Sequence, residues 1–452
     1  MFQRVLIANR GEIALRIIRA CQRLKIQTVA AYSEADADSS HLEQADRRVC
    51  IGPAKSADSY LNMAAILQAA EQTDCSAIHP GYGFLAENAL FAELCTQAKM
   101  TFIGPPAGAM RRLGDKATAR QTMRQAGLPI IPGSAGTLSG WEEARALAEA
   151  IGFPVLLKAT AGGGGKGMRR VDAAEDIEAK YREAALEAEK AFGNGALYLE
   201  KYIVDGRHIE FQVLADAYGN VVHLGERECS AQRRHQKLVE ESPSPVVDAR
   251  MRNELGAKIC SALAQVGYRN AGTVEFFRDA GGQLYFMEMN TRLQVEHPVT
   301  EMVTGRDLVV EQIRIAANEP LGFTQADVAL QGHAIECRIN AEDPAQDFRP
   351  HPGLVAKFVP PESGNGGDGA RVRVDTHVQP GYRIPPYYDS MLAKLVVWGK
   401  TREAAREGML RALGSFTVTG VKTTIPVHLQ IMQDPRFAAG DYDTGFIGRL
   451  LH

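Results

Sequence analysis

The chain has 452 residues, of which 45% are hydrophobic and 23% are charged, and its net charge of −3 lacks the basic excess that nucleic acids or anionic membranes attract. No run of about 20 apolar residues predicts a membrane span, and the N-terminal apolar run ends at Arg10, too early for a signal peptide. The seven cysteines are scattered without a C-x-x-C pair. This pattern predicts reduced thiols in the cytoplasm, not disulfides or a zinc site.

The first 105 or so residues alternate between strand and helix patterns. An apolar run at 4–8 predicts a buried strand, and helical spacing and a second strand follow it. Two more helix–strand repeats come next, so we expect an open parallel α/β domain. In such sheets a ligand binds beyond the carboxyl ends of the strands, here beside residues 9–12 (NRGE) and 79–83 (HPGYG).

A second unit begins near Pro129. It reads as a strand at 153–159, a glycine-rich loop, a strand at 168–171 and a helix from Asp172 to about Phe192. Strands dominate from about 207 to 292, with helices near 250–266 and 306–317. The last region is β-rich over 332–400, and its Gly/Pro/Ser-rich segment 360–369 is predicted to be a hairpin loop.

Two β-rich runs flank Gly281-Gly282, which is typical of a two-residue hairpin turn. Counting outward from that turn, Glu275 faces Glu288, and directly opposed like charges destabilise a ladder. A divalent cation between them would remove the conflict. Asn290 shares the face of Glu288 and adds a third oxygen, a ligand set that suits Mg²⁺ or Mn²⁺. The alternative is a solvated face whose register has slipped.

The glycine-rich loop at 158–168 contains G-x-G-x-x-G, but a strand follows it where a dinucleotide fold needs a helix. Gly167 after Lys166 also excludes a P-loop, which needs Ser or Thr there. We therefore predict a flap between antiparallel strands, whose backbone N–H groups cover phosphates and whose Lys158 supplies a cation. A flexible surface hairpin is the alternative.

Three further positions are ambiguous when taken alone. The basic stretch around Arg233, Arg234 and Lys237 is either a solvated face or an anion site. Lys116, at the start of a helix, is typical of a solvent lysine. Arg338 lies on an apparent strand among apolar residues, and a partly buried arginine needs an anionic partner.

Taken together, seven stretches resemble the biotin carboxylase family of ATP-grasp enzymes over essentially the whole chain: IANRGEIALRIIRA, HPGYGFLAEN, KATAGGGGKGM, ERECSAQRRHQK, EMNTRLQVEHPVTE, ECRINAEDP and PPYYDSM. The resemblance implies an α/β and α+β ATP-grasp fold. An N-terminal open parallel α/β (pre-ATP-grasp) domain is expected at 1–112. The ATP-grasp domain follows at 113–330, with a flap subdomain at about 131–203, and a C-terminal β-rich domain at 331–452.

The resemblance also implies an ATP-dependent ligase reaction in which MgATP phosphorylates bicarbonate and the carboxyl group passes to N1 of biotin. It implies phosphate contacts from Lys116, Lys158, Gly164 and Gly165, adenine contacts from Glu200, Lys201 and Ile203, and ribose or phosphate contacts from His208, Gln232 and His235. It implies metal ligands Glu275, Glu288 and Asn290, with two Mg²⁺ or Mn²⁺ sites. It implies a bicarbonate pocket of Lys237, Arg292, Gln294, Val295 and Glu296.

Within that set, the resemblance makes Glu296 the general base, Arg292 the residue that orients bicarbonate, and Arg338 the residue that stabilises the biotin enolate. Tyr82 matches a position beside the biotin rings. Lys237 completes the expected catalytic group.

No Met-Lys-Met biotinylation sequence occurs in the chain, so we expect a stand-alone subunit. Its partners would be a biotin carboxyl carrier protein and carboxyltransferase subunits, with acetyl-CoA carboxylase as the complex and malonyl-CoA and fatty acid synthesis as the pathway. A homodimer is implied by resemblance, and no nucleic acid or membrane partner is expected. The alternatives are a subunit of another acyl-CoA or pyruvate carboxylase, another ATP-grasp ligase, and a non-catalytic nucleotide-sensing scaffold. The scaffold would have lost site residues, and none is lost.

Overall fold

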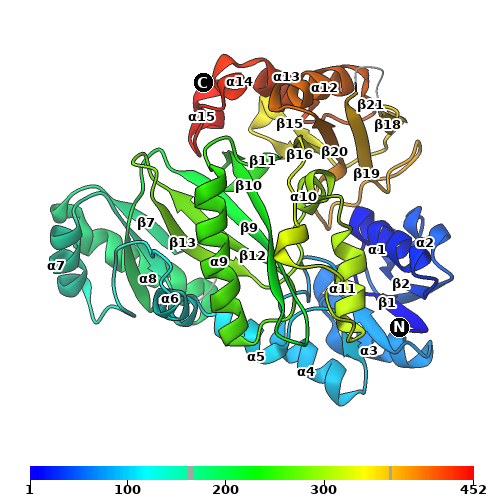
Figure 1. Ribbon diagram of the computed structural model, residues 1–452, viewed down its shortest axis with the longest axis horizontal. Helices are drawn as coiled ribbons and strands as arrows, with labels where there is room; N and C mark the ends of the chain where they lie inside the picture. Colours follow the sequence, from blue (N-terminus) through cyan, green and yellow to red (C-terminus); the bar gives the residue numbers. More distant parts are fainter. Residues whose placement is uncertain (161–166, 366–368, 452) are drawn as a thin grey trace.

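The computed structural model describes residues 1–160, 167–365 and 369–451. Its N-terminal part, blue in Figure 1, contains a parallel sheet, as the alternating pattern predicts. This sheet has five strands in the order β3-β2-β1-β4-β5. The strands are β1 (Arg4–Ile7), β2 (Gln27–Ser33), β3 (Arg47–Gly52), β4 (Ala77–His79) and β5 (Thr101–Phe102). The helices are α1 (Gly11–Arg23), α2 (His41–Gln44), α3 (Met63–Gln72), α4 (Ala89–Gln97), α5 (Ala107–Gly114) and α6 (Lys116–Gln125).

The strand order places the carboxyl ends of β1 and β4 side by side, where the winding of the sheet changes direction. The Asn9 amide joins the two segments that follow these strands, because Nδ2 donates to the carbonyls of Pro80 at 2.6 Å and Tyr82 at 2.7 Å. Both segments lie beyond the carboxyl ends of their strands, as predicted, and they contact each other there.

A small antiparallel sheet in the order β7-β6-β8 forms the flap region. Its strands are β6 (Val155–Ala159), β7 (Met168–Val171) and β8 (Leu197–Lys201), and helices α7 (Trp141–Ile151) and α8 (Ile177–Phe192) pack with them around Val155, Leu157 and Leu199. The antiparallel strand pair around the glycine-rich loop is confirmed. Helix α8 starts five residues later than predicted, because a 3₁₀ turn at Ala174–Asp176 precedes it.

The central element is a nine-stranded antiparallel sheet in the order β13-β12-β9-β10-β11-β14-β20-β19-β18. It crosses the expected domain boundary at 331 without a break, since β11 pairs with β14. Its strands are β9 (Arg207–Ala215), β10 (Val221–Arg233), β11 (Gln236–Ser242), β12 (Asn270–Arg278), β13 (Leu284–Asn290), β14 (His333–Asn340), β18 (Gly364–Asn365), β19 (Arg371–Thr376) and β20 (Met391–Gly399).

Helix α9 (Ala249–Val266) buries one stripe on this sheet. Leu255, Ile259 and Leu263, four residues apart, pack with Ile209 and Phe211 of β9. The alternate β9 residues point to the opposite face, which is how one strand serves both core and site.

The other elements complete the C-terminal half. The helices are α10 (His297–Thr304), α11 (Leu308–Ala316), α12 (Arg402–Ser415), α13 (Ile425–Gln433), α14 (Pro435–Ala439) and α15 (Phe446–Leu451), and the short strands are β15 (Glu342–Asp343), β16 (Arg349–Pro350), β17 (Lys357–Val359) and β21 (Thr417–Thr419). Among the described residues, no helix is both long and apolar enough to cross a membrane.

Candidate active site

The hairpin of β12 and β13 forms one wall of the site and confirms that Glu275 faces Glu288. The two-residue turn that predicted this pairing is wrong. The ladder closes at Arg278 and Leu284, which leaves a five-residue loop at 279–283, and the register shifts by one residue between Glu275 and Phe276. The compensating extra residue is Met287, a β-bulge in β13.

The bulge decides which side chains of β13 face the site. Leu284 and Phe286 are buried in the core, and in a regular strand Glu288 and Asn290 would lie on that same face. The extra residue turns Glu288 and Asn290 to the opposite face and returns Met289 to the core. One inserted residue thus lets the strand bury apolar side chains on both sides of the bulge while Glu288 and Asn290 face the site.

A buried group of polar side chains from β9, β10 and β12 supports this wall. All five N–H groups of the fully buried Arg227 are hydrogen bonded, with acceptors Glu210, Gln212, Thr273, Gln294 and Thr300 at 2.6–3.2 Å. Arg227 therefore fixes Glu210 and Gln294. Sequence reasoning missed both Arg227 and Glu210. The alternation of polar and apolar residues in HIEFQV could have indicated Glu210, but no local pattern marks Arg227.

The predicted catalytic residues Glu296, Lys237 and Arg338 meet at the end of this wall. Lys237 Nζ lies 2.5 Å from Glu296 Oε1, and Arg338 Nη2 lies 2.9 Å from Glu296 Oε2. Lys237 also contacts Glu210 at 2.5 Å and Glu275 at 3.5 Å. The solvated-face interpretation of the basic stretch is wrong for Lys237, whose side chain is only 12% exposed.

These charges shift the acid strength of the group. Burial alone would raise the pKa of Glu296, but Lys237, Arg338 and Arg227 outweigh burial and hold it well below its usual range. Burial lowers the pKa of Lys237, but the surrounding carboxylates help to raise it well above its ordinary value. The Lys237 ammonium therefore stays charged. Arg338 has the anionic partner that its burial requires, because Nε donates to Glu240 at 2.6 Å. Glu240 was not predicted.

Arg292 lies two residues beyond Asn290, the last residue of β13. Its Nε donates to Glu87 at 2.8 Å, and its Nη2 donates to Asn290 at 3.1 Å. Gln294 donates to Glu275 at 2.8 Å and accepts from Arg227. The carbonyl of Val295 accepts from the fully buried Lys394 at 3.0 Å.

Lys394 is linked through Glu12 to Tyr82, the predicted biotin residue. Its Nζ lies 3.0 Å from Glu12, and Glu12 also accepts from the hydroxyl of Tyr82. Tyr82 lines a cavity of about 240 Å³ between the NRGE and HPGYG segments and the aromatic pair Tyr387 and Tyr388. Neither Glu12 nor Lys394 was predicted. Tyr82 and the Glu296 cluster are connected through Lys394.

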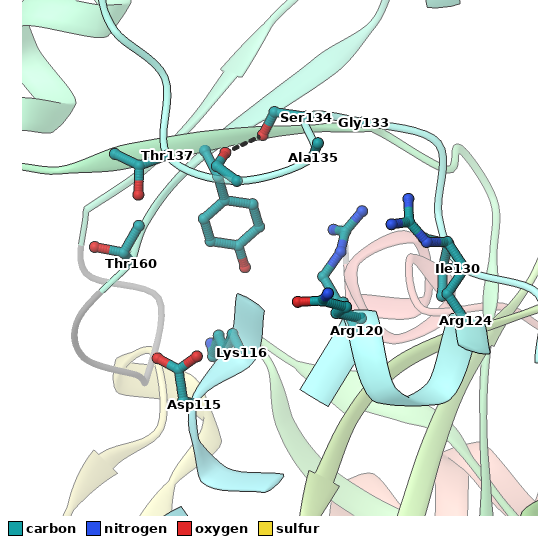
Figure 2. A pocket seen from close by; sticks show the side chains of 13 residues that line it. Asp115, Lys116, Arg120, Arg124, Ile130, Gly133, Ser134, Ala135, Thr137 and Thr160 are labelled. Atoms are coloured by element: carbon teal, nitrogen blue, oxygen red, sulfur yellow. Dashed lines mark hydrogen bonds between the residues drawn. The ribbon is translucent and has the colours of Figure 1, made fainter. Parts of the chain in front are cut away.

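The predicted phosphate lysines lie between the flap sheet and α6. Lys158 Nζ is 2.8 Å from Glu200, and Lys116 Nζ is 3.5 Å from Glu288. A small cavity adjoins Lys116 (Figure 2), with Arg120 and Arg124 on α6 at one side and Ser134, Thr137 and Thr160 across from them. The predicted loop residues Gly164 and Gly165 lie outside the described residues.

The remaining predicted nucleotide residues are dispersed around this cleft. Both carboxylate oxygens of Glu200 are taken by cations, Lys158 and Arg120, and Lys201 donates to the carbonyl of Phe153 at 2.8 Å. Ile203 is half-buried just after β8. His208 contacts Glu275 at 3.1 Å, and Gln232 is buried opposite Lys237. His235 lies exposed in the β10–β11 turn in a left-handed backbone conformation, apart from the buried group.

The predicted metal ligands are brought together only in part. Asn290 Nδ2 donates to Glu275 at 2.6 Å, whereas Glu288 points to Lys116. His208, Glu210 and Glu275 offer ligand atoms within 4.8 Å of one another. Glu275 and Glu288 lie opposite each other on one face, and each is paired with a lysine. If Lys116 turned from Glu288 to another anion, the carboxylate oxygens of this wall would suit Mg²⁺ or Mn²⁺.

Three family models match successive parts of the chain. Residues 1–110 match the model "Biotin carboxylase, N-terminal domain", residues 115–324 match "Carbamoyl-phosphate synthase L chain, ATP binding domain", and residues 336–449 match "Biotin carboxylase C-terminal domain". The chain belongs to the biotin carboxylase family. Enzymes of this family are ATP-dependent ligases, and the ATP-grasp fold expected from the motifs is confirmed.

Relatives within the family differ in the complexes they serve. Biotin carboxylase 1 of Bacillus subtilis is 55% identical over 99% of this chain and 98% of its own length. One of the pyruvate carboxylase subunits of Methanothermobacter thermautotrophicus is 49% identical over 99% of this chain and 90% of its own length. The biotin carboxylase domain dimer of Hydrogenobacter thermophilus 2-oxoglutarate carboxylase, in complex with MgADP, ADP and bicarbonate, has a TM-score of 0.95 at 49% identity, covering 100% of this chain and 99% of that one.

Proposed function

We propose that this chain carboxylates biotin on a biotin carboxyl carrier protein, using MgATP and bicarbonate, as the first half-reaction of acetyl-CoA carboxylase. The observation that carries the proposal is Glu296, a buried carboxylate with Lys237 on one oxygen and Arg338 on the other. An incoming bicarbonate would be attracted by these same cations. Glu296 is then within reach of the proton that bicarbonate must lose.

The cations that surround Glu296 determine when it is basic enough to take a proton. When Lys237 turns from Glu296 to bicarbonate, the pKa of Glu296 rises from its depressed value. Glu296 takes the hydroxyl proton of bicarbonate, an oxygen of the anion attacks the γ-phosphorus of ATP, and ADP leaves. Arg292 and Lys237 orient the anion, with Gln294 and the backbone at Val295 beside it.

The nucleotide is proposed to lie between the flap sheet and the β12–β13 wall. Lys116, Lys158, Gly164 and Gly165 would contact phosphates, Glu200, Lys201 and Ile203 the adenine, and His208, Gln232 and His235 the ribose and phosphates. Glu275, Glu288 and Asn290 would hold Mg²⁺ or Mn²⁺ in two sites, and the metal spreads the charge of the transferring phosphoryl group. The MgADP and bicarbonate bound by the Hydrogenobacter relative support this assignment.

Biotin is proposed to reach Arg338 past Tyr82, since the cavity beside Tyr82 is the larger of the two described above. A guanidinium at Arg338 would stabilise the weakly acidic ureido nitrogen as its anion. The domain limits 1–112, 113–330 (with the flap at about 131–203) and 331–452, a homodimer, and a cytoplasmic location belong to the same proposal. Seven unbonded cysteines fit a reducing compartment, and the dimeric relative supports a dimer.

The reaction is tested by measuring phosphate release from ATP in buffer stripped of bicarbonate, with bicarbonate restored, and with free biotin added. We expect release that depends on bicarbonate and rises with biotin. ATP hydrolysis that is undiminished without bicarbonate would instead indicate another ATP-grasp ligase.

The acyl acceptor needs a separate experiment, because relatives of this chain serve pyruvate and 2-oxoglutarate carboxylases. The tagged chain is isolated from its native host with its carrier and carboxyltransferase partners, and the assembly is assayed with acetyl-CoA, pyruvate and 2-oxoglutarate. Malonyl-CoA as the product supports a role in fatty acid synthesis. Carboxylation of pyruvate or 2-oxoglutarate alone would assign the chain to a different complex.

A further inference from the structure

Glu87 of the N-terminal sheet domain contacts the bicarbonate pocket, although it was not among the predicted site residues. Its Oε2 accepts from Arg292 Nε at 2.8 Å, and its Oε1 accepts from the backbone N–H of Thr291 at 2.9 Å. Thr291 is buried, so this N–H needs a protein acceptor. One carboxylate therefore fixes both the guanidinium and the chain segment that carries it.

The backbone around Glu87 is firmly held. Asn88 caps α4 by accepting from the N–H of Phe91, and Ala86 and Asn88 donate backbone hydrogen bonds to Gly83 and Leu85. Leu85 and Ala86 are buried in the N-terminal domain. Because Glu87 lies between a buried turn and a capped helix start, its backbone has little freedom to move.

Glu87 leaves the substrate side of Arg292 available. Glu87 accepts from Nε of Arg292. Nη2 of Arg292 donates once, to Asn290, and Nη1 donates once, to the carbonyl of Leu293 at 3.3 Å. A guanidinium has five N–H donors, so each terminal nitrogen keeps one for an anion. The geometry points to Glu87 as a positioning residue, which holds Arg292 in its anion-binding orientation before bicarbonate arrives. This inference rests on the proposed role of Arg292 in binding bicarbonate.

Glu87→Gln separates the two contacts. The Gln carbonyl can still accept from Thr291, but its amide nitrogen then faces Arg292 Nε as donor against donor. The loop stays in place while the guanidinium loses its restraint. Holding a long side chain in one rotamer ahead of binding is worth roughly 3- to 10-fold in affinity, so the Michaelis constant for bicarbonate should rise by that factor. The Michaelis constant for ATP and the turnover at saturating bicarbonate should stay within about twofold.

The experiment compares Glu87→Gln, Arg292→Ala and the double variant, with Glu93→Gln as a matched control. Glu93 lies in the same domain, is similarly exposed and is also paired with an arginine, Arg111, but away from the pocket. Bicarbonate-dependent phosphate release gives the constants, and thermal unfolding checks the fold. We expect the double variant to match Arg292→Ala, because Glu87 acts through Arg292.

Each outcome has a separate meaning. If Arg292→Ala raises the bicarbonate constant but Glu87→Gln does not, Glu87 has no positioning role. If Glu87→Gln lowers that constant, Glu87 competes with bicarbonate for Arg292, and the inference is overturned. If Arg292→Ala itself leaves the constant unchanged, the proposed role of Arg292 fails, and the inference fails with it.

Discussion

Lys237 and Glu296 form a buried ion pair in which the ammonium nitrogen lies 2.5 Å from one carboxylate oxygen. The other oxygen faces Arg338, so the proposed base has no open oxygen until a substrate anion draws the cations away. This makes the basicity of Glu296 depend on substrate binding, and it suppresses proton transfer from a water molecule to Glu296 when no substrate is bound.

Replacing Glu296 by Gln should abolish bicarbonate-dependent ATP hydrolysis, whether or not biotin is present. Loss of a general base typically reduces turnover by about 10²- to 10⁴-fold. ADP formation with and without biotin is the measurement. Substantial residual turnover with normal bicarbonate dependence would show that another group takes the proton.

Replacing Arg338 by Ala should separate the two half-reactions. If Arg338 stabilises the biotin anion, part of the bicarbonate-dependent ATP hydrolysis survives while carboxybiotin formation falls by roughly 10²- to 10³-fold, as for loss of an oxyanion donor. ADP and carboxybiotin are measured in the same samples. Equal loss of both products, with a raised bicarbonate constant, would place Arg338 at bicarbonate instead.

Replacing Glu288 by Gln should weaken metal-dependent turnover far more than folding. The Glu288 side chain is 37% exposed, and within the described residues its one ion pair is with Lys116, at 3.5 Å. Its loss should therefore leave the unfolding temperature of the metal-free protein nearly unchanged. The Mg²⁺ concentration for half-maximal activity should rise at least about 10-fold. Glu254→Gln, at an exposed ion pair on α9, is the control. An unchanged Mg²⁺ titration would remove Glu288 from the metal site.

Glu301 gives a prediction about pH and stability. Its carboxylate binds Arg16 of α1 at 2.8 Å and Arg373 of β19 at 2.7 Å, and so joins the N-terminal helix to the C-terminal strands. Burial alone would raise the pKa of Glu301, but the two arginines lower it to about 2 from an ordinary 4.5. The folded state therefore stays ionised where the unfolded state takes up a proton. The stabilisation is complete above pH 4.5 and is lost as the pH falls toward 2.

Glu301→Gln should accordingly lower the free energy of unfolding by about 3 kcal/mol near neutral pH. The difference from the parent protein should be constant between about pH 6 and 8 and should shrink below about pH 4.5. Urea unfolding across this range measures it, and Glu403→Gln, at an exposed carboxylate that is also paired with an arginine, is the control. A difference that does not vary with pH would mean that packing, not charge, is lost.

The sequence predicted the elements with strong local patterns. The strand position of Arg338 and the helix start at Lys116 follow from local alternation and burial. The pairing of Glu275 with Glu288 was predicted from the wrong turn, and it is right because the bulge in β13 compensates for that turn. Sequence reasoning missed Arg227, Lys394 and Glu87 because their partners lie far away along the chain. Thr300 is 73 residues from Arg227, Glu12 is 382 residues from Lys394, and Arg292 is 205 residues from Glu87. Such pairings depend on how sheets and domains meet, and no local periodicity reports that.

The bulge at Met287 divides the β12–β13 hairpin into two independent registers. On the turn side of the bulge, Leu284 and Phe286 face the core. On the other side, Glu288 and Asn290 face the site, and Met289 returns to the core. A change in the length of the 279–283 loop could therefore be absorbed before it reaches the carboxylates, whereas deletion of Met287 alone would rotate Glu288 and Asn290 toward the packed interior. In an alignment of homologues, length variation should concentrate in the loop, and the residue count between Phe286 and Glu288 should stay fixed.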